Sequence, residues 1–168
     1  MPRTETEFLV RGQKSKVKSN MISIDQIKKL REETEVSVSE CKKALEAAKG
    51  DKEAAKEILR KWGKDFAKKK RDRKVKQGII ESYIHPNKKI GVMLELRCET
   101  DFVGKSPDFQ KLAHELCLQI AAINPEGTPL FNQPWIRDET KTIKDLISEY
   151  IAKLGENIVL EKFIRYEL

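Results

Sequence analysis

The sequence predicts an α+β fold, in which a small helical domain precedes a larger domain that combines a sheet with helices. Apolar residues recur at helical spacing in the first part of the chain. Beyond Gly78 they alternate with polar residues, as is typical of strands with one buried face. Helical spacing then returns, and a strand-like run closes the chain. These changes divide the sequence into a tail (1–22), a three-helix domain (23–62), a basic linker (63–77) and a core domain (78–168).

Length and composition are typical of a small protein without a membrane anchor. The 168 residues suffice for one domain, or for a small domain and a larger one. No apolar run approaches the roughly 20 residues that a membrane-spanning helix requires, so we expect no membrane contact and a cytoplasmic location. The cysteines (Cys41, Cys98 and Cys117) form no Cys-x-x-Cys pair, which argues against a disulfide framework and a zinc site.

The net charge of +7 is concentrated in two segments. Residues 1–20 carry +3 and residues 64–76 carry +6, which leaves the remainder slightly acidic. The second segment would suit contacts to phosphates. We favour a solvated helical linker that ends at a hinge near Gly78, because only Phe66 interleaves with the charges and single-stranded nucleic acids are bound by stacking. We therefore expect no direct binding of nucleic acid.

Three short helices are predicted in the N-terminal domain. Ser23 or Asp25 caps the first helix, Ser37 and Glu40 form a capping box on the second, and Asp51 caps the third. Ile24, Ile27 and Leu30 recur at helical spacing in the first helix, and Cys41, Ala44, Leu45 and Ala48 lie on one face of the second. The residues predicted to face inward in the third helix are Ala54, Ala55, Ile58, Leu59 and Trp62.

The core domain is predicted to contain a three-stranded antiparallel sheet packed by helices. Residues 79–84 and 90–98 form a hairpin, because Val92, Leu94 and Leu96 alternate with more polar neighbours.

Two helices and a third strand complete the predicted core domain. The first helix begins at Ser106 or Pro107, and the second covers roughly residues 140–153 before Gly155 ends it. Residues 157–166 form the third strand. The apolar stripes are Phe109, Leu112, Ala113, Leu116, Ile120 and Ile123 on the first helix and Ile143, Leu146, Ile147 and Ile151 on the second.

Residues that carry enzyme chemistry are scarce. His85 lies in a predicted turn and His114 on a helix, and neither has a Cys, Ser or carboxylate at a catalytic spacing. The sequence has neither a Gly-x-x-x-x-Gly-Lys loop nor a Gly-x-Gly-x-x-Gly fingerprint, the usual sites for nucleotide phosphates. We therefore expect a protein that is not an enzyme, with no catalytic residues, no metal site and no cofactor.

The most informative segment is Glu99-Thr100-Asp101-Phe102-Val103, which connects the second predicted strand to a helix. Asp101 suits the start of a helix or a turn. Phe102 suits either an ordinary core contact or a contact with a partner, because burial in either place gains a Phe side chain ~1.5–3 kcal/mol.

Together with two other motifs, this segment resembles the elongation factor Ts family, from about Ile24 to Leu168. The other motifs are Leu30-Arg31-Glu32-Glu33-Thr34 with Cys41-Lys42-Lys43-Ala44-Leu45, and Lys153-Leu154-Gly155-Glu156-Asn157-Ile158. The resemblance implies a ubiquitin-associated-like helical domain and exchange of guanine nucleotide on the translational GTPase elongation factor Tu. With a single core domain, the chain is similar to the short form of the family. That form implies a homodimer through the core domains and a 2:2 complex with elongation factor Tu.

The resemblance also implies that residues 100–103 contact elongation factor Tu, and it implies a role for each of them. In this family the Phe of the motif enters the GTPase near its Mg²⁺ and the β-phosphate, which displaces the metal and releases GDP. Phe102 would be the intruding side chain and Asp101 a polar contact beside it. Thr100 and Val103 would set the geometry of the segment.

Two further contacts are implied. The helical domain would bind elongation factor Tu through Val36, Ser37, Val38 and Lys42, and the core domain through Leu154 and Gly155. The sequence departs from the family at the first of these, because the usual Thr-Gly-Ala-Gly is replaced by Thr34-Glu35-Val36-Ser37.

Two other functions compete with this interpretation. A binding module with a ubiquitin-associated-like domain would contact RNA or ribosomes through residues 64–76, in a manner that salt weakens. An enzyme would need a catalytic constellation that the sequence does not offer.

Overall fold

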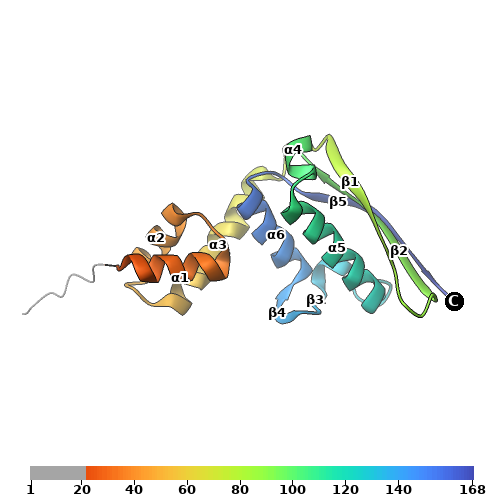
Figure 1. Ribbon diagram of the computed structural model, residues 1–168, viewed down its shortest axis with the longest axis horizontal. Helices are drawn as coiled ribbons and strands as arrows, with labels where there is room; N and C mark the ends of the chain where they lie inside the picture. The colour runs from red at the N-terminus through yellow and green to blue at the C-terminus, as the bar shows by residue number, and fades with distance from the viewer. Residues whose placement is uncertain (1–21) are drawn as a thin grey trace, which may run out of the picture.

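The structure, a computed structural model, describes residues 22–168 and has the predicted α+β class (Figure 1). The predicted tail lies outside the described residues, apart from Ile22. The N-terminal helices are α1 (Ile24–Thr34), α2 (Val38–Ala47) and α3 (Lys52–Lys70). The core contains β1 (Gln77–Ile84), β2 (Ile90–Cys98), α4 (Asp101–Gly104), α5 (Pro107–Ala122), the 3₁₀ helix η1 (Leu130–Asn132), β3 (Pro134–Trp135), β4 (Asp138–Thr142), α6 (Ile143–Leu154) and β5 (Val159–Glu167).

The first three helices begin at the predicted caps Ser23, Ser37 and Asp51. On α2 the Glu40 carboxylate accepts from the Ser37 hydroxyl, rather than from the backbone N–H of Ser37 as in the predicted capping box. Ser23 Oγ accepts a hydrogen bond from the backbone N–H of Gln26, and Ser37 Oγ accepts one from Glu40. Asp51 Oδ1 accepts from the N–H of Ala54 at 2.8 Å. The helices enclose a small core of their own, made of Leu30, Cys41, Ala44, Leu45, Ala55 and Leu59.

The prediction that Ala54 and Trp62 face inward is wrong, since Ala54 is exposed and the Trp62 side chain is 38% exposed. The buried stripe of α3 passes through Ala55, Leu59 and Gly63 instead. At Gly63 the helix lies against α6, where Ala152 is the nearest side chain. A Cβ atom at Gly63 would lie 3.6 Å from that of Ala152, within ordinary van der Waals contact, so the two helices pack closely at this point.

Helix α3 continues beyond the predicted boundary at residues 62 and 63, so the first half of the basic linker is helical. The predicted hinge near Gly78 is wrong. Gly78 lies within β1, paired with Arg97 of β2. A Cβ atom at Gly78 would lie 2.2 Å from the backbone oxygen of Leu96, so the glycine allows close contact between the strands rather than flexibility.

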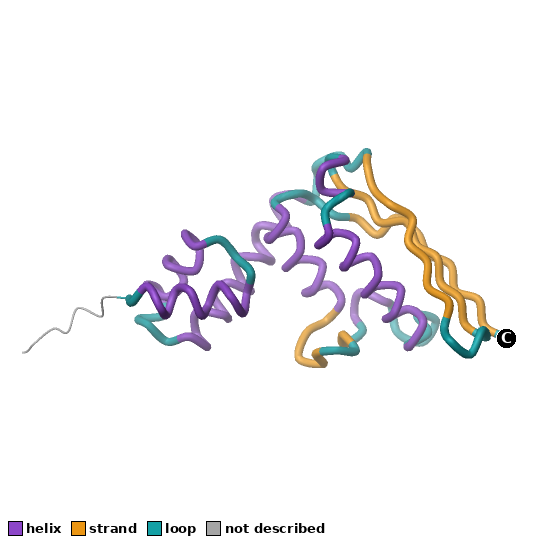
Figure 2. Tube along the Cα trace, viewed as in Figure 1, coloured by secondary structure: helices purple, strands orange, loops and turns teal. Residues whose placement is uncertain are grey.

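The predicted three-stranded antiparallel sheet is confirmed, with the order β1-β2-β5. Helix α5 covers one face of this sheet, and α6 packs behind α5 and against α3 (Figure 2). The core between them contains Leu94 and Leu96 from β2, Phe109, Leu112 and Leu116 from α5, and Ile143 and Leu146 from α6. Over residues 22–168, no helix is both long enough and apolar enough to cross a membrane.

The predicted start of the last helix is wrong by three residues, because residues 138–142 form strand β4 instead. This strand pairs with β3 in a small second sheet that the sequence did not predict. Helix α6 begins after Thr142, whose hydroxyl accepts from the N–H of Asp145 at 3.2 Å. The Asp145 carboxylate accepts in return from the N–H of Thr142, and this reciprocal cap fixes the start of the helix.

Candidate functional site

Residues 101–104 form the one-turn helix α4, which has two unlike faces. Thr100 is the N-cap of α4, and its hydroxyl accepts a hydrogen bond from the N–H of Val103 at 3.4 Å. Val103 is buried in the main core. Phe102 points the other way and is 82% exposed, so the structure excludes a core contact for its ring. The exposed Phe102 adds nothing to the stability of its own domain, although burial elsewhere would gain ~1.5–3 kcal/mol.

Asp101 lies beside Phe102 on the exposed face of the turn. Its carboxylate accepts a hydrogen bond from Lys105 Nζ at 2.8 Å. This hydrogen bond and the charge of Lys105 hold the pKa of Asp101 below its usual value. The segment therefore presents an aromatic ring next to an ionised carboxylate.

Behind the turn, three stretches of chain meet in one hydrogen-bonded network. The Glu156 carboxylate accepts from the N–H groups of Glu99 and Thr100, at 3.1 and 3.0 Å. It also accepts from the Thr100 hydroxyl at 2.6 Å. The Glu99 carboxylate accepts from the N–H of Asn157 at 2.7 Å, and Arg73 lies 3.4 Å from it. The sequence motif contained Glu156 and Asn157, but nothing in their spacing indicated that they reach the 100–103 segment.

Cys98, just before the segment, is a buried packing residue. Its thiol donates to the backbone oxygen of Thr100 at 3.1 Å. Burial, reinforced by the charge of Glu156, raises the pKa of the Cys98 thiol to about 11. The thiol is therefore protonated near neutral pH and offers no nucleophile.

In the helical domain, the residues that the resemblance implies as contacts with elongation factor Tu lie at or near the connection between α1 and α2. Ser37 and Val38 are exposed there, whereas Val36 is half-buried against the small helical core. Lys42 is exposed on α2, 3.9 Å from Glu46. In Figure 1 this connection lies at the end of the helical domain that is nearer to α6.

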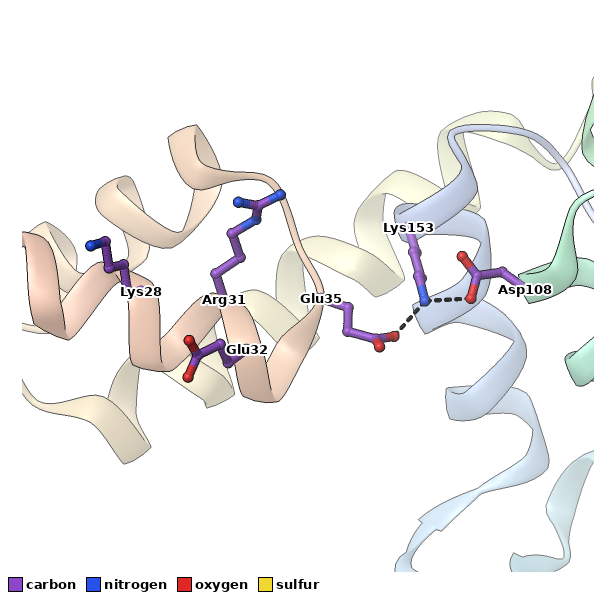
Figure 3. Close-up of a pocket in the computed structure, with 6 residues that line it drawn as sticks. All are labelled: Lys28, Arg31, Glu32, Glu35, Asp108 and Lys153. Carbon is purple, nitrogen blue, oxygen red and sulfur yellow. Dashed lines mark hydrogen bonds and ion pairs between the residues drawn. The ribbon is translucent and has the colours of Figure 1, made fainter.

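Glu35, at the end of α1, links this connection to the core domain. It adopts the left-handed conformation, with φ of 55°. Lys153 of α6 forms ion pairs with Glu35 and with Asp108, the latter at 2.7 Å (Figure 3). Because Lys153 belongs to α6, these ion pairs tie the helical domain to the core.

Leu154 and Gly155 form the turn at the end of α6. Leu154 is half-buried against the main core, and Gly155 ends the helix in the left-handed conformation, with φ of 75°. The Gly155 oxygen accepts from Lys70 Nζ at 2.8 Å. Because Glu156 follows directly, the structure brings this turn next to residues 100–103. The α1–α2 connection reaches the residue before this turn, Lys153, through its ion pair with Glu35.

The face of the three-stranded sheet that α5 does not cover carries an apolar patch beside ion pairs of Glu95 with Arg97 and Lys162. We call the apolar patch the outer sheet face and define it by its exposed residues: Ile80, Ile84, Met93, Ile164 and Tyr166. Met93 pairs with Ile164 across β2 and β5. Contiguous apolar side chains on one sheet face are typical of an interaction surface.

Part of the basic linker is engaged within the chain. Lys70 contacts both the Gly155 oxygen and the ring of Phe66, 4.9 Å from the ring centroid. Arg73 pairs with Glu99, and the backbone oxygens of Arg71 and Arg73 accept from the Asn157 side chain. These contacts favour the structural interpretation of the linker over a nucleic-acid interface.

Comparison with known proteins agrees with the three motifs. A family model described as Elongation factor TS matches residues 5–126 and 99–168. Elongation factor Ts of Thermotoga maritima is 42% identical, over 88% of this chain and 96% of that protein. Proteins of the same name from Coprothermobacter proteolyticus and Methylacidiphilum infernorum are 40% and 37% identical, over 88% and 89% of this chain and 98% and 96% of their own lengths. The chain belongs to the elongation factor Ts family of translation elongation factors.

Proposed function

We propose that this protein binds elongation factor Tu in its GDP form and promotes the exchange of GDP for GTP. The observation that carries the proposal is the exposure of Phe102 on a turn that is hydrogen-bonded to Glu156 on its inner side. Insertion of this ring into the GTPase would gain the burial energy that the free chain forgoes. That energy is then available to displace groups around the bound nucleotide.

Asp101 complements the ring. Carboxylate oxygens are preferred ligands of Mg²⁺, and a bound Mg²⁺ requires nearly ideal octahedral geometry. A negative charge brought next to the metal by Phe102 would disturb this geometry and loosen the β-phosphate. Asp101 is suited to this role because it is ionised and exposed.

The thermodynamics of exchange constrain the mechanism. A nucleotide bound with nanomolar affinity is held by roughly 12 kcal/mol and leaves slowly. A factor that weakens this binding is itself weakened to the same extent by the nucleotide. The factor therefore forms a transient ternary complex, from which either ligand can leave.

Further contacts would hold the GTPase in place during exchange. The proposed surface of the helical domain comprises Val36, Ser37, Val38 and Lys42, and that of the core comprises Leu154 and Gly155. Val38 and Lys42 are exposed and free to reach a partner.

A homodimer is part of the proposal. The outer sheet face supports it, because two copies packed sheet against sheet would cover the apolar side chains that a monomer exposes. Each dimer would bind two molecules of elongation factor Tu in the cytoplasm.

Release of labelled GDP from elongation factor Tu tests the proposal. We expect the protein to accelerate release in a manner that saturates with its concentration, and excess GDP to dissociate the complex. An unchanged release rate at micromolar concentrations would contradict the proposal. Salt-sensitive RNA binding that maps to residues 64–76, without an effect on GDP, would instead support the competing nucleic-acid function.

A further inference from the structure

We infer that Glu156 is a positioning residue, whose carboxylate sets the direction in which Phe102 and Asp101 project from the molecule. The inference rests on the proposed function, because it assigns the residue that keeps residues 100–103 in the orientation required for nucleotide exchange. Glu156 itself is half-buried behind the turn, and within the described residues its carboxylate accepts hydrogen bonds from residues 99 and 100.

The three hydrogen bonds to Glu156 fix the backbone immediately before α4. Two come from consecutive N–H groups, at 3.1 and 3.0 Å, and they hold residues 99 and 100 in one orientation. The third comes from the Thr100 hydroxyl at 2.6 Å. A hydroxyl has one proton, so donation to Glu156 turns its lone pairs toward the N–H of Val103. The carboxylate therefore also orients the cap of α4.

The short length of α4 makes this cap decisive. Four residues cannot form a stable helix by themselves, because the first turn fixes several dihedrals for a single hydrogen bond. The direction of the Phe102 ring therefore depends on what holds the two ends of the turn. Val103 anchors one end in the core, and Glu156 holds the other.

A reciprocal contact makes the support rigid. The Glu99 carboxylate accepts from the N–H of Asn157, so residues 99–100 and 156–157 each bind the backbone of the other. The buried Asn157 side chain also donates to the backbone oxygens of Arg71 and Arg73, at 3.2 and 2.9 Å. The end of α3 is thereby joined to the same point.

Glu156→Gln tests the inference with little change in shape. In the amide, one oxygen can still accept from the two backbone N–H groups, but the NH2 group that replaces the other oxygen cannot accept from the Thr100 hydroxyl, which must then turn its proton elsewhere. The hydrogen bonds also lose the negative charge that strengthens them. We expect the maximal rate of GDP release to fall about tenfold, with the half-saturating concentration within about twofold of wild type. Glu139→Gln, at an exposed glutamate of β4, is the matched control and keeps the wild-type rate.

The mechanism is tested by combining the variant with Phe102→Ala. If Glu156 acts by aiming Phe102 and Asp101, Glu156→Gln changes the maximal rate less in the Phe102→Ala background than in the wild type. An equal loss in both backgrounds would overturn the inference, because Glu156 would then act independently. A loss confined to the half-saturating concentration would also overturn it, because Glu156 would then be a binding contact.

Amide hydrogen exchange gives a readout that does not depend on elongation factor Tu. We expect the N–H groups of Glu99 and Thr100 to exchange faster in Glu156→Gln than in the wild type, while the strands of the sheet remain protected. If hydrogen exchange at these two amides were unchanged in Glu156→Gln, the inference would be overturned, even if the wild-type protein accelerated GDP release as proposed. A wild-type protein that leaves GDP release unchanged would contradict the proposed function instead, and the two failures are thus distinguished.

Discussion

At the scale of single residues, some side chains of the 100–103 segment anchor it to the protein, and others project into solvent. Val103 packs in the core, Thr100 caps the turn, and Phe102 projects into solvent. The sequence identified the segment but left two environments open for Phe102, because a Phe next to an apolar strand suits both. The outcome depends on the phase of a single helical turn, and this phase is set by Glu156, 54 positions after Phe102. Spacing within the segment contains no information about such a distant contact.

Thr100 offers a direct test at this scale. Thr100→Val keeps the shape of the side chain but removes the hydroxyl, and with it the cap of α4 and one bond to Glu156. We expect a loss of about 1 kcal/mol in the free energy of unfolding, together with slower GDP release. Thr100→Ser retains the hydroxyl and should stay close to wild type in both measurements. Equal behaviour of the Val and Ser variants in urea unfolding and GDP release would contradict the role assigned to the hydroxyl.

At the scale of elements, local signals determine most of the fold. The caps at Ser23, Ser37 and Asp51 and the alternation in β2 each predicted an element that the structure contains. The small sheet of β3 and β4 was not predicted, because these strands are short and β4 is polar. The exposure of Trp62 also escaped prediction, because it depends on where α6 crosses α3. In each case a tertiary contact overrode a local pattern.

Gly78 allows the pairing of β1 and β2 to be tested. In Gly78→Ala the new Cβ atom would lie 2.2 Å from the Leu96 oxygen and 2.8 Å from the Arg97 Cα, so the strands must separate locally. We expect a loss of roughly 1–3 kcal/mol in the free energy of unfolding, measured by urea denaturation. Gly127→Ala is the control, since a Cβ there would meet no atom within 4 Å. Equal stability of the two variants would show that the strands do not approach as closely as the structure indicates.

At the scale of the whole molecule, the helical domain and the core are joined by α3 and by ion pairs. Helix α3 packs against α6, and Lys153 bridges Glu35 of the helical domain and Asp108 of the core (Figure 3). The sequence predicted the order of the segments along the chain. It could not predict their arrangement, because Glu35 and Lys153 are separated by 118 positions. The same holds for the outer sheet face, which becomes visible only when the three strands are placed in register.

The outer sheet face leads to a prediction about assembly. We expect the wild-type protein to sediment as a dimer at micromolar concentrations, and Ile164→Lys to sediment as a monomer, because the substitution places a charge within the apolar patch, opposite Met93. Ile164 is 47% exposed in the single chain. Ile24→Lys on α1, where the side chain is 72% exposed, is the control and should remain dimeric. A wild-type monomer in sedimentation equilibrium would contradict the proposed dimer.

In the proposed mechanism, an outward-facing ring at position 102 drives GDP from elongation factor Tu. The most direct test of this mechanism is the rate of labelled GDP release with saturating Phe102→Ala, compared with saturating Phe131→Ala, which removes another exposed Phe, from η1. We predict that Phe102→Ala retains its thermal stability, because the ring is 82% exposed, and that it accelerates release at least about tenfold less than Phe131→Ala. Equal acceleration by the two variants would contradict this mechanism.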